Sequence, residues 1–127
     1  MRLLSGEYPA AAQALEQALG LFRDVGGRGG EAEALNERGT LHRVTGDLVQ
    51  AEGCHRQALD LARAIASSWN EAHALAGLGR RALAAGHATR AAALLRQALE
   101  IFQRIGAAEA GDLSRELAAL TESGPPA

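Results

Sequence analysis

The sequence lacks lysine altogether and is poor in cysteine and aromatic residues. Of its 127 residues, one is cysteine and 3% are aromatic, and all 13 basic residues are arginine. The single Cys54 excludes a disulfide within the chain and fits a reducing compartment. Because large rings are scarce, alanine and leucine must build the core, and such small side chains favour helices that pack closely.

Long apolar segments and a strong net charge are also missing. A transmembrane helix needs about 20 consecutive apolar residues, and no segment approaches this length. Residues 1–6 contain too short an apolar stretch for a signal peptide, so we expect a cytoplasmic protein. The net charge of -2 offers no basic surface to nucleic acid or anionic lipid, so neither direct nucleic-acid binding nor membrane binding is expected.

An internal repeat is the main feature that the sequence does have. Glycine, alanine and a Gln-Ala-Leu triplet each return after 40 residues, at Gly6, Gly46 and Gly86, at Ala11, Ala51 and Ala91, and at 17–19, 57–59 and 97–99. A second set has the same step: Glu31, Ala32, Ala34, Leu35 and Gly39 return as Glu71, Ala72, Ala74, Leu75 and Gly79. The chain is therefore expected to repeat one structural unit.

Within each unit the apolar residues follow the spacing of an amphipathic helix, i, i+3, i+4, i+7. Glycine-rich or polar breakers separate these runs at 26–30, at 67–70 and at Gly106. We therefore predict an all-α protein with six antiparallel helices, at 7–24, 31–45, 48–66, 70–85, 88–105 and 109–121. Residues 122–127 are predicted to form a frayed tail.

Small residues occupy the repeating positions, where we expect paired helices to cross. A glycine inside a helix costs about 1 kcal/mol relative to alanine, so Gly39 and Gly79 need a packing reason. The positions expected to meet them on the following helices are Ala51, Ala58, Ala91 and Ala98. Gly46 and Gly86 are expected to end the first helix of each pair in a left-handed conformation, which carries no side-chain penalty for glycine.

These residues resemble the tetratricopeptide repeat (TPR). The strings 34–59 and 75–99 each have a small residue on the first helix, a glycine turn seven residues later and two alanines on the second helix. The resemblance implies one α-α superhelix over residues 1–127, made of a lone second helix at 7–24, repeats at 31–66 and 70–105, and a capping helix at 109–121. HEAT and armadillo repeats, the next alternative, share the period but lack this glycine–alanine register.

The 40-residue step is longer than the standard repeat of about 34 residues. It is similar to the step in kinesin light chains and in the C-terminal TPR arrays of actinobacterial signal-transduction ATPases that regulate antibiotic genes. The exclusive use of arginine is typical of a GC-rich genome and agrees with an actinobacterial source. Arg38, His42 and His55 depart from the pattern, because leucine and aromatic residues are usual at these positions.

The resemblance implies that the first helix of each pair lines a concave binding groove. The groove-facing positions are then Glu33, Asn36, Thr40 and Arg43, followed by His73, Ala76, Arg80 and Leu83, and by Ser114 on the last helix. The Asn36 amide is suited to bind a peptide backbone, and Arg43 and Arg80 are suited to bind carboxylates of a ligand. Ordinary solvated surface is the alternative interpretation of every one of these positions.

Other combinations of residues are weaker signals. Cys54, His55 and His42 provide three zinc ligands if they meet, but no fourth ligand has suitable spacing, and packing roles are the alternative. The run 26–30 lacks the Gly-Lys-Ser/Thr ending of a phosphate loop, so a flexible loop is expected. Trp69 is expected in a loop, where it staples the start of the next helix to the neighbouring repeat, and stacking on a ligand is the alternative. No catalytic set is evident, and no cofactor is expected.

We therefore expect a non-enzymatic TPR module that binds another protein or peptide, within or beside a bacterial transcriptional or signalling regulator. A ligand- or signal-peptide-sensing TPR domain is the first alternative, and a metal-binding protein is the second. Leu3, Leu4, Tyr8, Leu15 and Leu19 are expected to leave an apolar N-terminal face that forms a homodimer or docks on further repeats.

Overall fold

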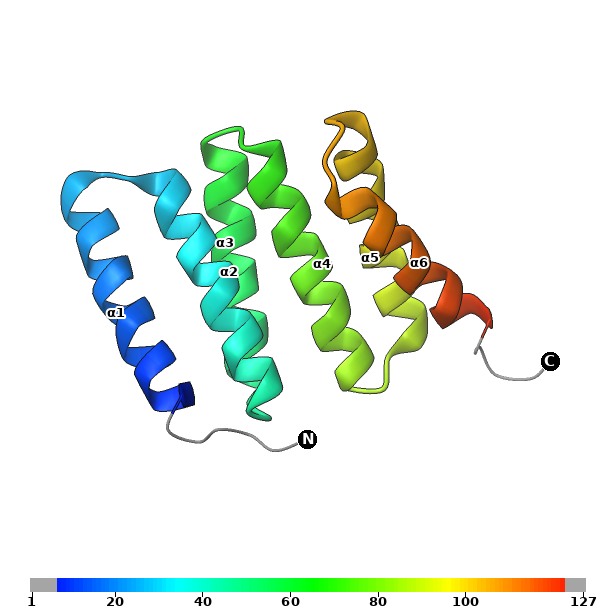
Figure 1. Ribbon diagram of the computed structural model, residues 1–127, viewed down its shortest axis with the longest axis horizontal. Coiled ribbons are helices and arrows are strands. Elements are labelled where there is room, and N and C mark those ends of the chain that lie inside the picture. Colours follow the sequence, from blue (N-terminus) through cyan, green and yellow to red (C-terminus); the bar gives the residue numbers. More distant parts are fainter. Residues whose placement is uncertain (1–6, 123–127) are drawn as a thin grey trace.

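The computed structural model describes residues 7–122, and every regular element in this range is a helix. The helices are α1 (Glu7–Val25), α2 (Arg28–Val44), α3 (Leu48–Ala64), α4 (Ser68–Ala84), α5 (Ala88–Arg104) and α6 (Glu109–Glu122), and Figure 1 shows that consecutive helices run in opposite directions. The all-α class is therefore confirmed. Glu122, predicted to open the tail, ends α6, and the rest of that tail, 123–127, lies outside the described residues. None of these helices is long and apolar enough to cross a membrane.

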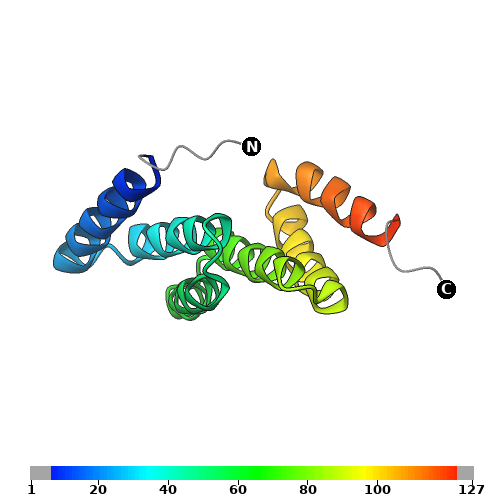
Figure 2. The same ribbon diagram turned by 90° about the horizontal axis from the view of Figure 1, so that it is seen from below.

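The helices stack into a curved array. α2 packs on α3, α4 packs on both of them, and α5 packs on α4, whereas α1 and α6 pack at the two ends on α2 and α5. Seen from below, α1 and α6 lie at opposite ends of the row and on the same side of it, while α3 lies on the other side (Figure 2). The surface of α2 and α4 between the two end helices is therefore the inner side of the curve.

Short turns with defined caps join the helices. The Asp47 carboxylate accepts a hydrogen bond from the backbone N–H three residues later at 3.1 Å, which starts α3. The Ser67 hydroxyl accepts one at the start of α4 in the same way, at 3.3 Å. Gly46 and Gly86 follow α2 and α4 with φ of 94° and 87°, which is the left-handed conformation expected of them. The ends of the helices are thus fixed locally.

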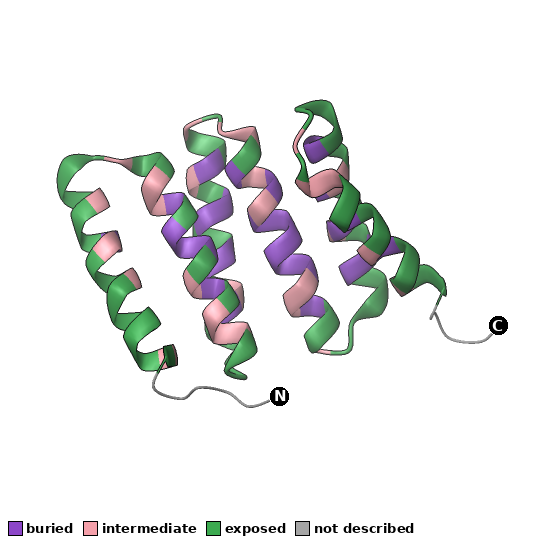
Figure 3. Ribbon diagram, in the orientation of Figure 1, coloured by how far each residue is buried: buried purple, intermediate pink, exposed green. Residues whose placement is uncertain are grey.

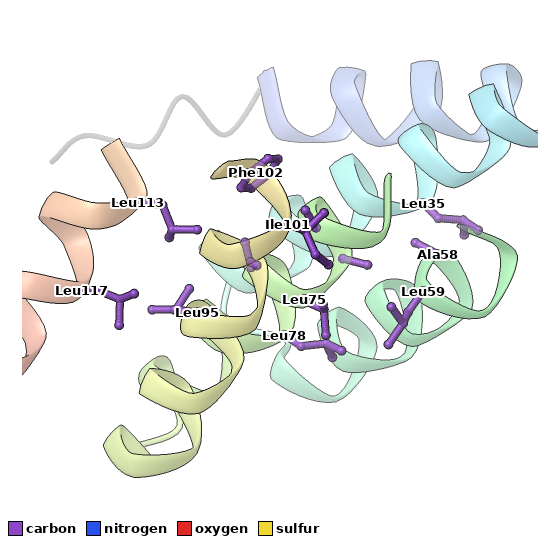
Figure 4. Close-up of a cluster of buried hydrophobic side chains, with 14 of the residues drawn as sticks. Leu35, Ala58, Leu59, Leu75, Leu78, Leu95, Ile101, Phe102, Leu113 and Leu117 are labelled. Carbon is purple, nitrogen blue, oxygen red and sulfur yellow. The ribbon is translucent and has the colours of Figure 1, made fainter. Parts of the chain in front are cut away.

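Alanine and leucine build the core where the helices cross. The repeating alanines Ala51, Ala58, Ala91 and Ala98 are each 0% exposed. An added Cβ at Gly79 would lie 2.9 Å from the Leu95 side chain, which is the packing reason for that glycine. Buried residues gather on α2, α3, α4 and α5, whereas α1 is mostly exposed (Figure 3). Figure 4 shows Leu113 and Leu117 of α6 pointing toward Leu95, so the core continues into the last helix.

The glycine-rich run 26–30 is not a loop throughout, which corrects the expectation from the sequence. α2 begins at Arg28, so Gly29 and Gly30 belong to its first turn. An added Cβ at Gly30 would lie 2.3 Å from the Phe22 ring of α1. Because a real Cβ cannot approach a ring so closely, glycine at this position lets α1 and α2 pack together.

The N-terminal helix is covered more than the sequence indicated. Leu19 is buried in the core, and Leu15 packs against the same cluster. The expectation that Leu19 contributes to an open apolar face is therefore wrong, because one face of α1 is buried on α2. Leu3 and Leu4, which were assigned to the same face, lie outside the described residues.

Candidate functional site

A pocket of about 270 Å³ lies between α2 and α4. Its lining consists of Glu33, Asn36, Glu37, Thr40, His55, Trp69, Asn70, His73, Gly77 and Arg80. The structure thus brings together five of the nine predicted groove residues, namely Glu33, Asn36, Thr40, His73 and Arg80. Four do not line the pocket: Arg43, almost one turn further along α2, the buried Ala76 and the exposed Leu83 of α4, and Ser114, which is exposed on α6.

His55 of α3 forms part of the pocket lining because two glycines leave room for its ring. The residue is only 1% exposed. An added Cβ at Gly39 of α2 would lie 2.6 Å from His55 Nε2, and one at Gly77 of α4 would lie 2.3 Å from Cε1. A larger residue at either position therefore forces the ring to move. The His55 ring is therefore the packing reason for Gly39 that was expected from the sequence. Gly77 makes a second close contact with this ring, and this contact was not predicted.

Two asparagines hold the His55 ring in place. Asn36 Nδ2 donates to the Asn70 backbone carbonyl at 3.5 Å, and Asn36 Oδ1 lies 2.8 Å from His55 Nδ1. Because the Asn36 nitrogen faces a carbonyl, its oxygen faces the ring, and we assign the imidazole proton to Nδ1. The Asn36 amide, expected from the sequence to bind a peptide backbone, is instead 8% exposed and hydrogen-bonded within the fold.

Burial keeps His55 uncharged near neutral pH. The pKa of His55 is lowered from 6.5 to about 4, first because burial disfavours the cation and then because Arg43 and Arg80 repel it. A neutral imidazole donates from one nitrogen and accepts at the other. With the proton on Nδ1, the acceptor is Nε2.

Lowering the pH is expected to destabilise the fold through His55. Between about pH 6.5 and 4 the unfolded chain binds a proton at this residue and the folded chain does not, so stability falls as the pH falls. Relative to its value above about pH 6.5, the free energy of unfolding is expected to be about 2 kcal/mol lower at pH 5 and about 3 kcal/mol lower at pH 4 through this residue. Urea denaturation at pH 7 and pH 5 measures this loss. If the variant His55→Gln loses as much free energy of unfolding between pH 7 and pH 5 as the wild type, the pH dependence does not come from His55.

Polar side-chain contacts tie α4 to α6 beside the pocket. Arg80 donates from Nε and Nη2 to the two carboxylate oxygens of Glu116, each at 3.0 Å. His73 Nε2 lies 3.0 Å from a carboxylate oxygen of Glu109. The backbone N–H of Glu109, and after it His73, hold the pKa of this carboxyl below its usual value. The guanidinium of Arg80, expected to bind a ligand carboxylate, therefore already binds one from α6.

Trp69 stands at the rim of the pocket. It lies in the first turn of α4 and not in a loop, which corrects the expectation from the sequence. The residue is 38% exposed, and its ring centroid is 4.1 Å from that of His73. The His73 ring in turn lies in a T-shaped arrangement with the Phe102 ring, and the two ring centroids are 5.1 Å apart. The three rings form a row from the pocket rim into the core.

The zinc ligands considered from the sequence do not assemble. Within residues 7–122 no group of three or more His, Cys, Asp and Glu side chains is placed to hold a metal ion. Cys54 is buried, and burial raises the pKa of its thiol, which disfavours the thiolate form that metals bind. His55 Nδ1 already bonds to Asn36. The described residues therefore give no support to a metal-binding function.

Half of the pocket was not predicted from the sequence. The missed residues are Glu37, His55, Trp69, Asn70 and Gly77. His55 was missed because it comes from the second helix of a pair, which the repeat pattern assigns to the back of the array. Gly77 carried an available signal, because a glycine inside a predicted helix requires a close neighbour.

Comparison with known proteins supports the repeat. Residues 30–104, which are more than half of the chain, match the model of a family described as tetratricopeptide repeat. No curated protein matches the chain. The matched range runs from the first turn of α2 to the end of α5, so it includes both helix pairs and every residue that lines the pocket.

Proposed function

The chain belongs to the tetratricopeptide repeat family, and on this premise we propose that it binds a peptide segment of another protein between α2 and α4. Repeats of this family are typically interaction modules without catalysis of their own, and their curvature provides an extended concave surface for a partner. The observation that carries the proposal is the pocket, in which exposed residues such as Glu33 and Thr40 surround a buried polar floor around His55. Such a floor is preorganised, so little ordering is needed on binding.

A small-molecule sensor is a less well supported alternative. Pockets for drug-sized ligands usually have volumes of about 300 to 1,000 Å³. The pocket between α2 and α4 has about 270 Å³, and part of its lining is exposed. It is therefore better suited to one or two side chains of a partner whose remaining surface lies on the neighbouring helices.

We further propose that the module works within or beside a bacterial signalling or transcriptional regulator. The support is the resemblance to long-helix TPR arrays of such regulators. α2 and α4 begin 40 residues apart, at Arg28 and Ser68, and α3 and α5 begin 40 residues apart, at Leu48 and Ala88. On this proposal α1 to α6 form one domain, in which α2–α3 and α4–α5 are the repeats and α6 is the cap.

Dimerisation through the N-terminal end stays a prediction. Tyr8 and Leu15 of α1 line a hollow together with Leu41 and Val44 of α2. Val25, at the end of α1, is exposed. Apolar surface at the end of a stacked array is where a further repeat or a second copy packs.

A blocking substitution tests the proposed peptide-binding function. Peptides selected from a random phage-displayed library on the full chain are expected to bind Thr40→Phe at least about tenfold more weakly, because the ring fills the pocket without entering the core. The matched control is Thr89→Phe, since Thr89 is also exposed but lies on α5. Calorimetric titration measures both affinities. Selected peptides that bind Thr40→Phe as tightly as the wild type would show that the pocket is not the binding site.

A further inference from the structure

Two buried acceptors of the pocket lining have no hydrogen-bond donor among the described residues: His55 Nε2 and Asn70 Oδ1. Asn70 is 6% exposed, and its amide nitrogen donates to the Ser67 hydroxyl at 3.1 Å and to the Gly29 carbonyl at 3.4 Å. The oxygen is therefore the unused half of this amide. A buried acceptor without a donor is unfavourable. The lone pairs of these two atoms place negative partial charge beneath the pocket, which disfavours an anionic occupant.

The unpaired charges of the pocket rim are negative. Glu33 and Glu37 lie four residues apart on α2, both are exposed, and neither forms an ion pair within residues 7–122. The arginine in the lining, Arg80, is bound to Glu116 of α6. Two carboxylates are thus left without a cation at the mouth of the pocket, above two buried acceptor atoms that have no donor. The arrangement favours a positively charged group.

An aromatic surface accompanies these acceptors. Trp69 precedes Asn70 on α4, and it is one of the exposed large apolar residues of the described chain. Cations bind over the face of an indole ring more favourably than over other aromatic rings, and a guanidinium also stacks on it through its plane. The rim therefore offers a cation both charge complementarity and a flat apolar contact.

We infer that this pocket receives a basic side chain of the bound peptide, arginine in preference to lysine, and the inference rests on the peptide-binding function proposed above. A guanidinium has five N–H donors in one plane, whereas an ammonium group has three on a single nitrogen. The guanidinium can donate two N–H groups to a rim carboxylate of Glu33 or Glu37 while its plane lies on Trp69. The volume of about 270 Å³ suits one such side chain.

Four short peptides with one backbone test the charge of the occupant. They have the sequence acetyl-Gly-Ser-X-Ser-Gly-amide, with arginine, lysine, citrulline or glutamate at X. Trp69 is the one tryptophan of the chain, so its fluorescence reports binding at the pocket directly. The arginine peptide is expected to bind most tightly and the lysine peptide next. The citrulline peptide, which keeps the shape of arginine but not its charge, is expected to bind about tenfold more weakly than the arginine peptide, and the glutamate peptide more weakly still.

Charge-neutralising variants identify the groups that recognise the cation. The double variant Glu33→Gln, Glu37→Gln is expected to weaken binding of the arginine peptide about tenfold while leaving the citrulline peptide nearly unchanged. Glu100→Gln is the matched control, because Glu100 is exposed on α5 and lies outside this pocket. Since all three glutamates are exposed, the variants are expected to melt at the same temperature as the wild type.

The outcomes separate this inference from the function on which it rests. Equal affinities for the four peptides, or tighter binding of the glutamate peptide, would overturn the inference and leave peptide binding intact. An arginine peptide that binds the double variant as well as it binds the wild type would also overturn it. If none of the four peptides changes the fluorescence, the inference fails, and the library selection with Thr40→Phe decides independently whether the chain binds peptides.

Discussion

Gly77→Ala is expected to lower the free energy of unfolding by about 2 to 3 kcal/mol, although alanine is the better helix former. The new Cβ would lie 2.3 Å from Cε1 of His55 and 2.4 Å from its Nδ1. The ring cannot retreat toward α2, because Gly39 bounds it there, and any displacement stretches the hydrogen bond to Asn36. Overpacking of this kind typically costs about 1 to 3 kcal/mol, and a lost buried hydrogen bond adds to it.

The same substitution on α3 provides the control for this prediction. Gly53 also lies inside a helix, but an added Cβ there would meet nothing within 4 Å. Gly53→Ala is therefore expected to stabilise the fold by about 1 kcal/mol through helix propensity alone. Urea denaturation of both variants at pH 7 measures the contrast. When His55 is already replaced by alanine, Gly77→Ala is expected to lower the free energy of unfolding much less. A loss of stability that persists in this background would show that the imidazole ring is not its cause.

Phe102→Ala is expected to cost about 3 to 5 kcal/mol, the largest loss predicted for a single side chain of this protein. Phe102 is 2% exposed and belongs to the same buried cluster as Leu113 of α6. Its removal leaves a cavity where α5 meets α6, and it removes the edge contact with the His73 ring. A typical domain has a free energy of unfolding of about 5 to 15 kcal/mol, so this loss is a large fraction of the total stability.

An exposed residue just beyond the same helix provides the control for Phe102. Ile105 follows the last turn of α5 and is among the exposed large apolar residues. Ile105→Ala is therefore expected to cost less than about 1 kcal/mol. Chemical denaturation of both variants, followed by far-UV circular dichroism, gives the comparison. Equal losses would mean that Phe102 is not part of the core that anchors α6.

Both predictions concern the support of the pocket as much as the stability of the fold. His55 links the first three helices of the two repeats, because it belongs to α3 and lies against a glycine of α2 and another of α4. Phe102 lies beneath His73, which contacts both Trp69 at the rim and Glu109 of α6. The residues that line the pocket are therefore held by the same packing that joins neighbouring repeats. A change in the stacking of the repeats is expected to change the pocket.

The six helices could be predicted from the sequence because their signals are local. Apolar spacing, the breakers and the glycine turns act over a few residues, and the helices of the structure begin and end within three residues of the predicted limits. The errors have a common cause. Gly29, Gly30 and Trp69 were assigned to loops by composition, yet all three lie in helices, and the missing side chain of Gly30 leaves the space that the Phe22 ring, eight residues earlier, occupies. Tertiary packing overrides local preference at such positions.

The composition of the pocket could be predicted only in part. The repeat pattern places the first helix of each pair on the inner side, which was enough to indicate Glu33, Thr40 and His73. It could not indicate His55, because a side chain from the back of the array reaches the inner side only where two glycines make room. Nor could it show that the Asn36 amide is already hydrogen-bonded within the fold, because its partner His55 lies 19 residues away.

By itself, the sequence determined the helices, their ends and the small residues at their crossings, because periodicity and glycine geometry act between near neighbours along the chain. Only the tertiary structure decided which polar groups are paired within the fold and which are left unpaired. Arg80 is neutralised by Glu116, 36 residues away, and the Asn70 nitrogen is held by Gly29, 41 residues away. Hydrogen bonds and ion pairs between distant residues depend on how the helices stack, and this stacking leaves the carboxylates of Glu33 and Glu37 and the oxygen of Asn70 without a donor among the described residues.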